Sequence, residues 1–217
     1  MNNMLIITGS DGETAKGLIN FFASKYKHII GISRHQKTHY NQESVKTVKA
    51  DMLSYVDVKN VTSSIIDKYG NVDGWINCVG GFNMGKTIEE EEDWTSMHSI
   101  NFTTCLNGCR AIIPYLKRQG DGAIINFGSK AALDGFSSAG PYLISKSSVH
   151  TLTKLISIEL STSNIRCNAI LPGIIDTEAN RTAMPNEDFS IWESPKDIAI
   201  KINDIIHSDV SGELVTL

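Results

Sequence analysis

Short runs of β-branched and apolar residues alternate along this chain with longer segments in which apolar residues recur every three or four positions. The short runs predict strands at residues 5–8, 28–32, 45–49, 74–78, 123–127, 166–171 and 214–217. The longer segments predict helices at residues 13–25, 54–69, 91–117, 139–161 and 195–207. The strand Leu5-Ile6-Ile7 is wholly apolar, as in strands that are covered on both faces. The alternation predicts a Rossmann-type α/β fold: a doubly wound, parallel, seven-stranded sheet with helices on both faces.

Length and charge narrow the class of protein. The 217 residues are 41% hydrophobic, which favours a single domain over residues 1–217 with a core of its own. The net charge of −4 and the absence of a Lys/Arg-rich stretch argue against nucleic-acid binding. No apolar run approaches the roughly 18 residues of a membrane span, and the N-terminus lacks a basic signal region, so we expect no membrane partner and a cytoplasmic location.

The cysteines do not suggest a metal site. Cys78, Cys105, Cys109 and Cys167 form no C-x-x-C motif and have no histidine nearby in the sequence. We expect reduced core thiols and no metal.

An acidic run covers residues 89–93. Thr87 precedes Glu90 by three residues, the spacing of a capping box, and carboxylates stabilise the first turn of a helix. The run therefore predicts a helix start.

A glycine-containing segment follows the first predicted strand: Thr8-Gly9-Ser10-Asp11-Gly12-Glu13-Thr14-Ala15. Gly9 would permit a tight turn, Gly12 would let the main chain approach a diphosphate, and Ala15 would keep the next helix close to the strand. Asp11 and Glu13 would repel a diphosphate unless they point away. A plain strand-to-helix turn is the alternative.

The second and third predicted strands end in residues that bear on the choice of cofactor. Ser33 and Arg34 occupy the place where many dinucleotide folds carry a carboxylate for the ribose diol. They suit a 2′-phosphate, which favours NADPH, with NADH also possible; a solvated surface arginine is the alternative. Asp51, after the third strand, would accept a hydrogen bond from adenine or cap the following helix.

Two Tyr-x-x-x-Lys pairs occur, Tyr55 with Lys59 and Tyr142 with Lys146. The second pair follows Pro141, a favoured residue in the first turn of a helix, and Ser129 lies thirteen residues before Tyr142 at a strand end. The pair at Tyr142 is therefore the candidate for catalysis.

This combination resembles the short-chain dehydrogenase/reductase family. The segment Asn77-Cys78-Val79-Gly80, the residue Asn101, and the run from Asn168 through Pro172-Gly173 to Thr177 are similar to family motifs. The resemblance places a nicotinamide cofactor against Thr8, Gly9, Gly12, Ala15, Ser33, Arg34, Asp51, Asn77, Gly80, Tyr142, Lys146, Pro172, Gly173, Ile175 and Thr177.

Carbonyl reduction requires hydride on carbon and a proton on oxygen. Tyr142 would donate the proton, and the nearby ammonium of Lys146 would lower the tyrosine pKa and bind the nicotinamide ribose. Ser129 would hydrogen-bond the substrate oxygen, and Asn101 would hold a water that links Lys146 to solvent. The expected function is an oxidoreductase that interconverts a small carbonyl compound and its alcohol.

A closer similarity is to dihydropteridine reductase-like members, through residues 130–135, Tyr142, Lys146 and several positions between 176 and 192. Ser129 and the Ser33-Arg34 pair depart from that pattern. Reduction of quinonoid dihydropterin is therefore an alternative function, and a nucleotide-sensing protein without turnover is another.

Two further expectations concern the substrate and the assembly. Residues 178–193 would cover the substrate as a lid, with Met184, Phe189 and Trp192 giving a modest, partly apolar pocket. The resemblance also implies a homodimer or homotetramer, formed through the helices predicted at 91–117 and 139–161.

Overall fold

The computed structural model describes residues 2–90 and 94–217, which fold around one parallel sheet. The strands are β1 (Asn2–Thr8), β2 (Tyr26–Ser33), β3 (Val45–Lys49), β4 (Gly74–Asn77), β5 (Asp121–Phe127), β6 (Asn164–Leu171) and β7 (Leu214–Thr216). Their order across the sheet is β3-β2-β1-β4-β5-β6-β7, and every neighbouring pair runs parallel. The predicted seven-stranded Rossmann-type fold is confirmed. The strand order reverses direction between β1 and β4, which is where such sheets bind ligands.

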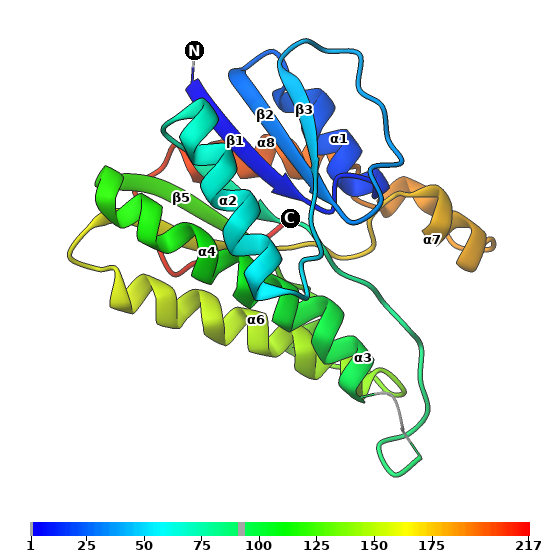
Figure 1. The fold of residues 1–217 in the computed structure, drawn as a ribbon. Helices are drawn as coiled ribbons and strands as arrows, with labels where there is room; N and C mark the ends of the chain where they lie inside the picture. The colour runs from blue at the N-terminus through cyan, green and yellow to red at the C-terminus, as the bar shows by residue number, and fades with distance from the viewer. Residues whose placement is uncertain (1, 91–93) are drawn as a thin grey trace.

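Helices cover both faces of the sheet (Figure 1). The longer helices are α1 (Glu13–Phe22), α2 (Tyr55–Tyr69), α4 (Thr104–Gln119), α6 (Gly140–Glu159) and α8 (Pro195–Ile206). Shorter ones are α3 (Trp94–His98), α5 (Ala131–Asp134), α7 (Glu178–Ala183) and a 3₁₀ turn at Phe189–Ile191. In Figure 1, α2, α4 and α6 lie on one face, and α1 and α8 on the other.

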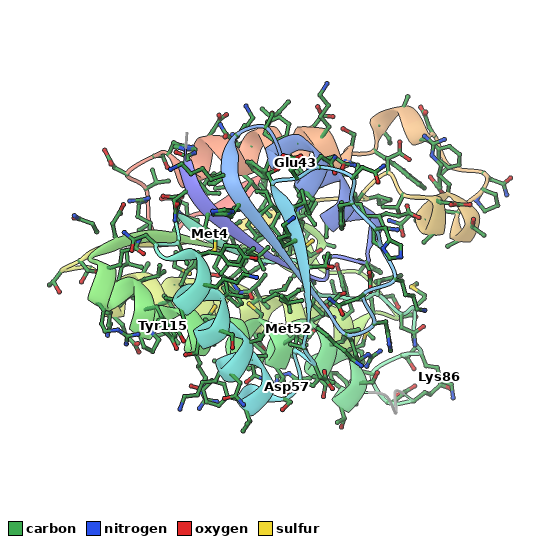
Figure 2. The ribbon with its side chains drawn as sticks, turned by 45° about the horizontal axis from the view of Figure 1, so that its top comes forward. Met4, Glu43, Met52, Asp57, Lys86 and Tyr115 are labelled. Atoms are coloured by element: carbon green, nitrogen blue, oxygen red, sulfur yellow. The ribbon has the colours of Figure 1, made fainter. Side chains whose placement is uncertain are left out.

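Alternate strand residues supply two separate apolar cores. On β1, Met4 and Ile6 pack with the α2, α4 and α6 layer, whereas Leu5 and Ile7 pack with α1 and α8. Figure 2 shows Met4 between the strands and the layer that carries Tyr115. Burial on both faces explains why the run from Met4 to Ile7 is apolar at every position.

The segment predicted as one helix over 91–117 is helical without a break over residues 94–119, but it contains one turn of π-helix. Residues 91–93 lie outside the described residues; α3 is followed by a π-helical turn at Ser99–Thr103 and then by α4. The predicted helix start at 89–93 is wrong for its first residues: Ile88, Glu89 and Glu90 form a turn, in which the Thr87 hydroxyl bonds the Glu90 carboxylate at 2.9 Å. The other predicted helices and strands are confirmed within a few residues at each end.

Candidate active site

Two adjoining cavities lie at the carboxyl ends of the strands. The larger, of about 500 Å³, extends along the ends of β1, β2 and β3. The smaller, of about 230 Å³, lies between the ends of β5 and β6 and helix α6. Cys78, Val79 and Gly80 line both cavities and so join them. A long molecule with two ends can therefore bind across the centre of the sheet.

The turn after β1 suits a diphosphate. Gly9 adopts φ +74°, and the Gly12 N–H bonds the Gly9 carbonyl at 2.9 Å, so the chain turns tightly beside the larger cavity. Helix α1 has Gly12 as its N-cap and no side-chain cap, whereas α2, α7 and α8 are capped by Ser54, Thr177 and Ser194. The first N–H groups of α1 are thus left without a side-chain acceptor, as an anion-binding helix terminus requires.

The two carboxylates of this turn are occupied elsewhere. Asp11 accepts a hydrogen bond from the Thr38 N–H at 2.9 Å, in the loop after β2. Glu13 accepts one from the Glu178 N–H at 2.7 Å, at the start of α7. Glu13 is thus engaged with the start of α7, whereas Asp11 bonds the loop after β2 and still lines the larger cavity.

Thr8 and Asn77 are expected at the cofactor, but in this structure their side chains bond other residues of the protein. The Thr8 hydroxyl accepts a hydrogen bond from the Cys78 N–H at 3.0 Å. The Asn77 amide bonds Trp75 at 2.7 Å and Asn126 at 2.8 Å. Both side chains are buried and lie outside the linings of the two cavities. Sequence position alone did not show that Thr8 and Asn77 bond other residues of the protein at this edge of the sheet.

Ala15 also lies inside the protein. It is buried in the core between α1 and the sheet, so it acts by letting the helix approach closely and not by touching a ligand.

Ser33, Arg34 and Asp51 all line the larger cavity. Ser33 is buried, and its hydroxyl accepts the Gln36 N–H at 3.1 Å. Arg34 is exposed, and its Nε lies 3.0 Å from the His35 ring. Asp51 accepts the Leu53 N–H at 3.0 Å, while Ser54 caps the next helix. Arg34 is therefore the residue of this set whose charge is open to a ligand.

Tyr142 and Lys146 line the smaller cavity from the first turns of α6. Lys146 is buried, and its ammonium donates a hydrogen bond to the Phe127 carbonyl at the end of β5, at 2.8 Å. The Phe82 ring meets the Tyr142 ring edge-on, with centroids 4.9 Å apart. The other Tyr-x-x-x-Lys pair lies on α2, where Arg110 stacks on the Tyr55 ring. The tertiary structure thus separates the two pairs.

The expected lowering of the Tyr142 pKa is not found in this structure. Burial raises the pKa of the phenol above its ordinary value of 10.0, and a hydrogen bond with the Ser129 side chain opposes that rise. Burial also lowers the pKa of Lys146 to about 8, against which Cys105 and Cys78 act. The physical reason is desolvation, which disfavours the charged form of each group. At neutral pH both groups carry their protons.

Ser129 and Asn101 complete the set. Ser129 is buried two residues beyond the end of β5. Asn101 lies in the π-helical turn, where its amide bonds both the N–H and the carbonyl of Gly81 at 3.0 Å and the Ser145 hydroxyl at 3.1 Å. Gly80 packs between Asn101 and Lys146: a methyl group there would lie 2.9 Å from Asn101 Oδ1 and 3.3 Å from Lys146 Nζ. The two side chains thus converge on one point of the main chain.

Residues 172–177 form the far wall and the start of the lid. Pro172, Gly173 and Ile175 line the smaller cavity. The Thr177 hydroxyl accepts the Asn180 N–H at 3.2 Å and caps α7, so its side chain is used in the helix start.

The lid over residues 178–193 stays a prediction, but its apolar side chains are not placed as expected. Phe189 packs on the buried Trp192, with ring centroids 4.7 Å apart, and Arg181 stacks on Phe189. Neither aromatic ring nor Met184 lines the smaller cavity; Asn180 is the residue of 178–193 that does.

Sequence reasoning missed several lining residues. Thr14 and Phe127 line the smaller cavity, as do Phe82 and Asn180. Phe127 and Thr14 lie close to predicted strand ends, but many other residues do as well. Phe82 and Asn180 lie farther along their loops, where the sequence pattern does not mark a cavity.

Two absences are observed. Among residues 2–90 and 94–217, no group of three histidine, cysteine or acidic side chains is placed to hold a metal ion. Within the same residues, no helix has both the length and the apolar character to cross a membrane.

All four cysteines are free; Cys105, Cys109 and Cys167 are buried, and Cys78 is partly exposed to the cavities.

This fold, with its open helix terminus and its Tyr-x-x-x-Lys pair at a strand edge, defines a dinucleotide-binding oxidoreductase. The sequence model described as "short chain dehydrogenase" matches residues 3–188, and the chain belongs to that family. It is an NAD(P)-dependent oxidoreductase by class.

Curated relatives and solved structures agree with this class. The chain is 36% identical over 132 residues to a 3beta-hydroxysteroid dehydrogenase of Mediterraneibacter gnavus, covering 60% of this chain but only 48% of that protein. It is 27% identical over 190 residues to 2-(R)-hydroxypropyl-CoM dehydrogenase of Xanthobacter autotrophicus, covering 82% of this chain and 76% of that protein. The structure titled "ElxO with NADP Bound" superimposes with a TM-score of 0.91 at 22% identity, over 100% of this chain and 97% of that one. The closer similarity to dihydropteridine reductase stays a prediction.

Proposed function

We propose that this protein is an NADPH-preferring reductase of a small carbonyl compound, in which Tyr142 donates the proton to the substrate oxygen. The observation that carries this proposal is the placing of Tyr142 and Lys146 in the smaller cavity, which joins the larger one through residues 78–80. The joined cavities suit a dinucleotide with its reactive end beside a phenol.

A bound nicotinamide would supply the hydride to the substrate carbon. Tyr142 is protonated at neutral pH because burial raises its pKa, and that is the form a proton donor must have. Ser129, which hydrogen-bonds the tyrosine side chain, would hold the carbonyl oxygen at the same point. Lys146 is charged at neutral pH, with a pKa of about 8, and is placed to bind a ribose hydroxyl or to replace the proton that Tyr142 gives away.

The preference for NADPH rests on the larger cavity. Arg34 is exposed at the end of β2 and lines this cavity together with Ser33 and His35. A guanidinium suits a 2′-phosphate in geometry and charge. The solved structure with the TM-score of 0.91 is titled as having NADP bound, which supports the same preference.

Tyr142→Phe tests the proposal, and Tyr55→Phe is the matched control because Tyr55 belongs to the second Tyr-x-x-x-Lys pair on α2. A panel of small ketones and aldehydes is assayed with NADPH. We expect Tyr142→Phe to lower kcat at least 100-fold with NADPH binding kept, and Tyr55→Phe to keep wild-type turnover. Retention of most turnover by Tyr142→Phe would remove the tyrosine from this role. NADPH binding by the wild-type protein without turnover of any substrate would favour nucleotide sensing.

Reduction of quinonoid dihydropterin is the second candidate. The Phe82 ring beside Tyr142 supports it, because an exposed aromatic edge next to the proton donor suits a flat heterocycle. Hydride then goes to a ring position, and a serine that binds a carbonyl oxygen is not needed. Ser129→Ala separates the two: nearly full pterin turnover with little carbonyl reduction would favour the pterin substrate.

A second copy of the chain is the proposed partner, as the family resemblance implies. Helix α6 exposes Ile144, Leu155 and Ile158, the last at 68% of its surface. A further cavity of about 400 Å³ is lined by Phe102, Ile144, Leu152 and Leu155. Light scattering of the wild type and of Ile158→Glu tests the assembly: we expect a dimer or tetramer that the charge weakens, and a monomeric wild type would contradict the proposal.

A further inference from the structure

His150 lies one helical turn beyond Lys146 on α6, and the mechanism above does not use it. The side chain is only 6% exposed, although histidine is not a common core residue. Its ring faces the segment Gly128-Ser129, where β5 has ended and the chain passes the smaller cavity. His150 is therefore a candidate for placing Ser129.

The contact between His150 and this segment is close. The Ser129 N–H donates a hydrogen bond to Nε2 of His150 at 3.2 Å. A methyl group at Gly128 would lie 2.5 Å from the same nitrogen and 2.7 Å from Cδ2, so only glycine lets the main chain pass over the ring. Because Nε2 accepts, the imidazole is neutral with its proton on Nδ1. Burial, together with the charges of Lys146 and Lys154, lowers the pKa of His150 to about 4 and keeps it in this form.

The neighbouring hydrogen bonds show why the contact is needed. The N–H groups of Gly128 and Lys130 bond the carbonyls of Ile170 at 2.9 Å and Pro172 at 3.0 Å, on the side of β6. The Ser129 N–H between them points to the other side, where α6 and not a strand lies. Without His150 this buried N–H would have no partner, at a cost of about 1–3 kcal/mol.

We propose that His150 is a positioning residue for Ser129, holding the main chain after β5 so that the Ser129 hydroxyl faces the Tyr142 phenol. The inference rests on the proposed function. Its consequence is that carbonyl reduction needs a hydrogen-bond acceptor at position 150, although that side chain touches neither substrate nor cofactor.

The experiment compares His150→Phe, which keeps a ring but has no acceptor, with His150→Gln, which keeps an acceptor. Thr153→Val is the control: Thr153 is buried on the next turn of α6 and bonds Asn126 at 3.0 Å, away from Ser129. We expect His150→Phe to lower kcat about tenfold with the KM for NADPH within twofold, His150→Gln to recover part of the loss, and Thr153→Val to lower only the melting temperature. In the Ser129→Ala background, His150→Phe should lower kcat less than twofold further, because the two residues act as one unit.

An equal tenfold loss in the presence and absence of the Ser129 hydroxyl would overturn the proposal, as would full activity of His150→Phe. A second readout does not depend on turnover. In amide hydrogen exchange followed by NMR, His150→Phe should expose the Ser129 N–H while Gly128 and Lys130 keep their protection. Unchanged protection of Ser129 would also overturn the proposal, whereas an inactive wild type with the expected exchange would contradict the proposed function alone.

Discussion

Glu13 in the first turn of α1 accepts a hydrogen bond from the main-chain N–H of Glu178 at 2.7 Å, and this contact joins the turn after β1 to the first residue of α7. In Figure 1, α7 projects from the body of the protein near the end of β1. The end of the segment 178–193 is held at Glu193, whose carboxylate accepts the Gly173 N–H at 2.7 Å and whose carbonyl accepts the Asp176 N–H at 2.9 Å. Glu13 thus holds the beginning of the segment 178–193, whereas Glu193 holds its end.

Glu13→Ala should loosen the lid. A hydrogen bond between a carboxylate and a helix N–H at the surface contributes about 1 kcal/mol, which corresponds to about a fivefold change in an equilibrium constant. We expect the KM for substrate to rise about three- to fivefold and limited proteolysis within 178–193 to become faster. Glu187→Ala, an exposed carboxylate on the same segment, is the control. Identical proteolysis of the two variants would contradict a holding role for Glu13.

Lys146→Met should stabilise the protein at neutral pH while abolishing activity. The folded-state pKa of Lys146, about 8, lies below its ordinary value of 10.5, so at pH 7 both states are charged and the folded state bears the whole cost of desolvation. This pKa difference corresponds to about 3 kcal/mol of unfavourable free energy in the folded state, which Lys146→Met removes. The variant also loses the hydrogen bond to the Phe127 carbonyl, and this loss reduces the gain. We expect a gain of about 1–2 kcal/mol in the free energy of unfolding.

The pH dependence of that gain has a definite sign. Above pH 8 the folded wild type loses its proton before the unfolded chain does, so its desolvation cost falls until about pH 10.5. The advantage of Lys146→Met should therefore shrink between pH 8 and pH 10. Urea unfolding of both proteins at pH 7 and pH 9.5 measures the difference, and a difference that grows with pH would be inconsistent with a charged, buried lysine.

Arg34→Ala should change the choice of cofactor. Removing a guanidinium that faces a 2′-phosphate costs about 1.5–3 kcal/mol, so the Kd for NADPH should rise about 10- to 100-fold while that for NADH changes less than threefold. Isothermal titration with both nucleotides measures this. Arg110→Ala, which removes the cation stacked on Tyr55, is the control. Equal weakening for both nucleotides would show that Arg34 does not recognise the extra phosphate.

Gly80→Ala should damage catalysis through crowding. The added methyl group would lie 2.9 Å from Asn101 Oδ1 and 3.3 Å from Lys146 Nζ, so one of these side chains must move. We expect kcat to fall at least tenfold and the free energy of unfolding to fall by about 1–3 kcal/mol. At Gly81 the nearest atom to an added methyl group is Ile100 Cδ1 at 3.4 Å, so Gly81→Ala should have the smaller effect on both quantities. A larger effect of Gly81→Ala than of Gly80→Ala would show that the main chain at Gly80 can move to make room for the methyl group.

Much of the fold could be predicted from local pattern. The apolar runs 5–7 and 123–125 are typical of buried strands, because both faces of the sheet are covered. The segment 91–117 could not be resolved, because a π-helical turn changes the hydrogen bonding without changing the apolar spacing in a recognisable way. The turn places Asn101 against Gly81, a contact between residues twenty positions apart.

The site was predicted in part. Tyr142, Lys146 and Ser129 occur where strand ends and a helix start were expected; the structure places Tyr142 and Lys146 in the lining of the smaller cavity and the Ser129 side chain next to Tyr142. The hydrogen bonds that Asn77 and Thr8 make within the sheet could not be predicted, because an amide or a hydroxyl at a strand end can bond a neighbouring strand as well as a ligand. The direction in which the Tyr142 pKa shifts was also predicted wrongly. Burial raises this pKa, and burial depends on which residues cover the side chain in the fold.

The sequence by itself determined the order of strands and helices, the glycine-containing turn and the residue types available for proton transfer, because these follow from spacing along the chain. The tertiary structure alone decided where Asp11 and Glu13 find partners, and that the Ser129 N–H bonds His150. Those outcomes depend on burial and on contacts between distant segments, and neither is encoded in local periodicity.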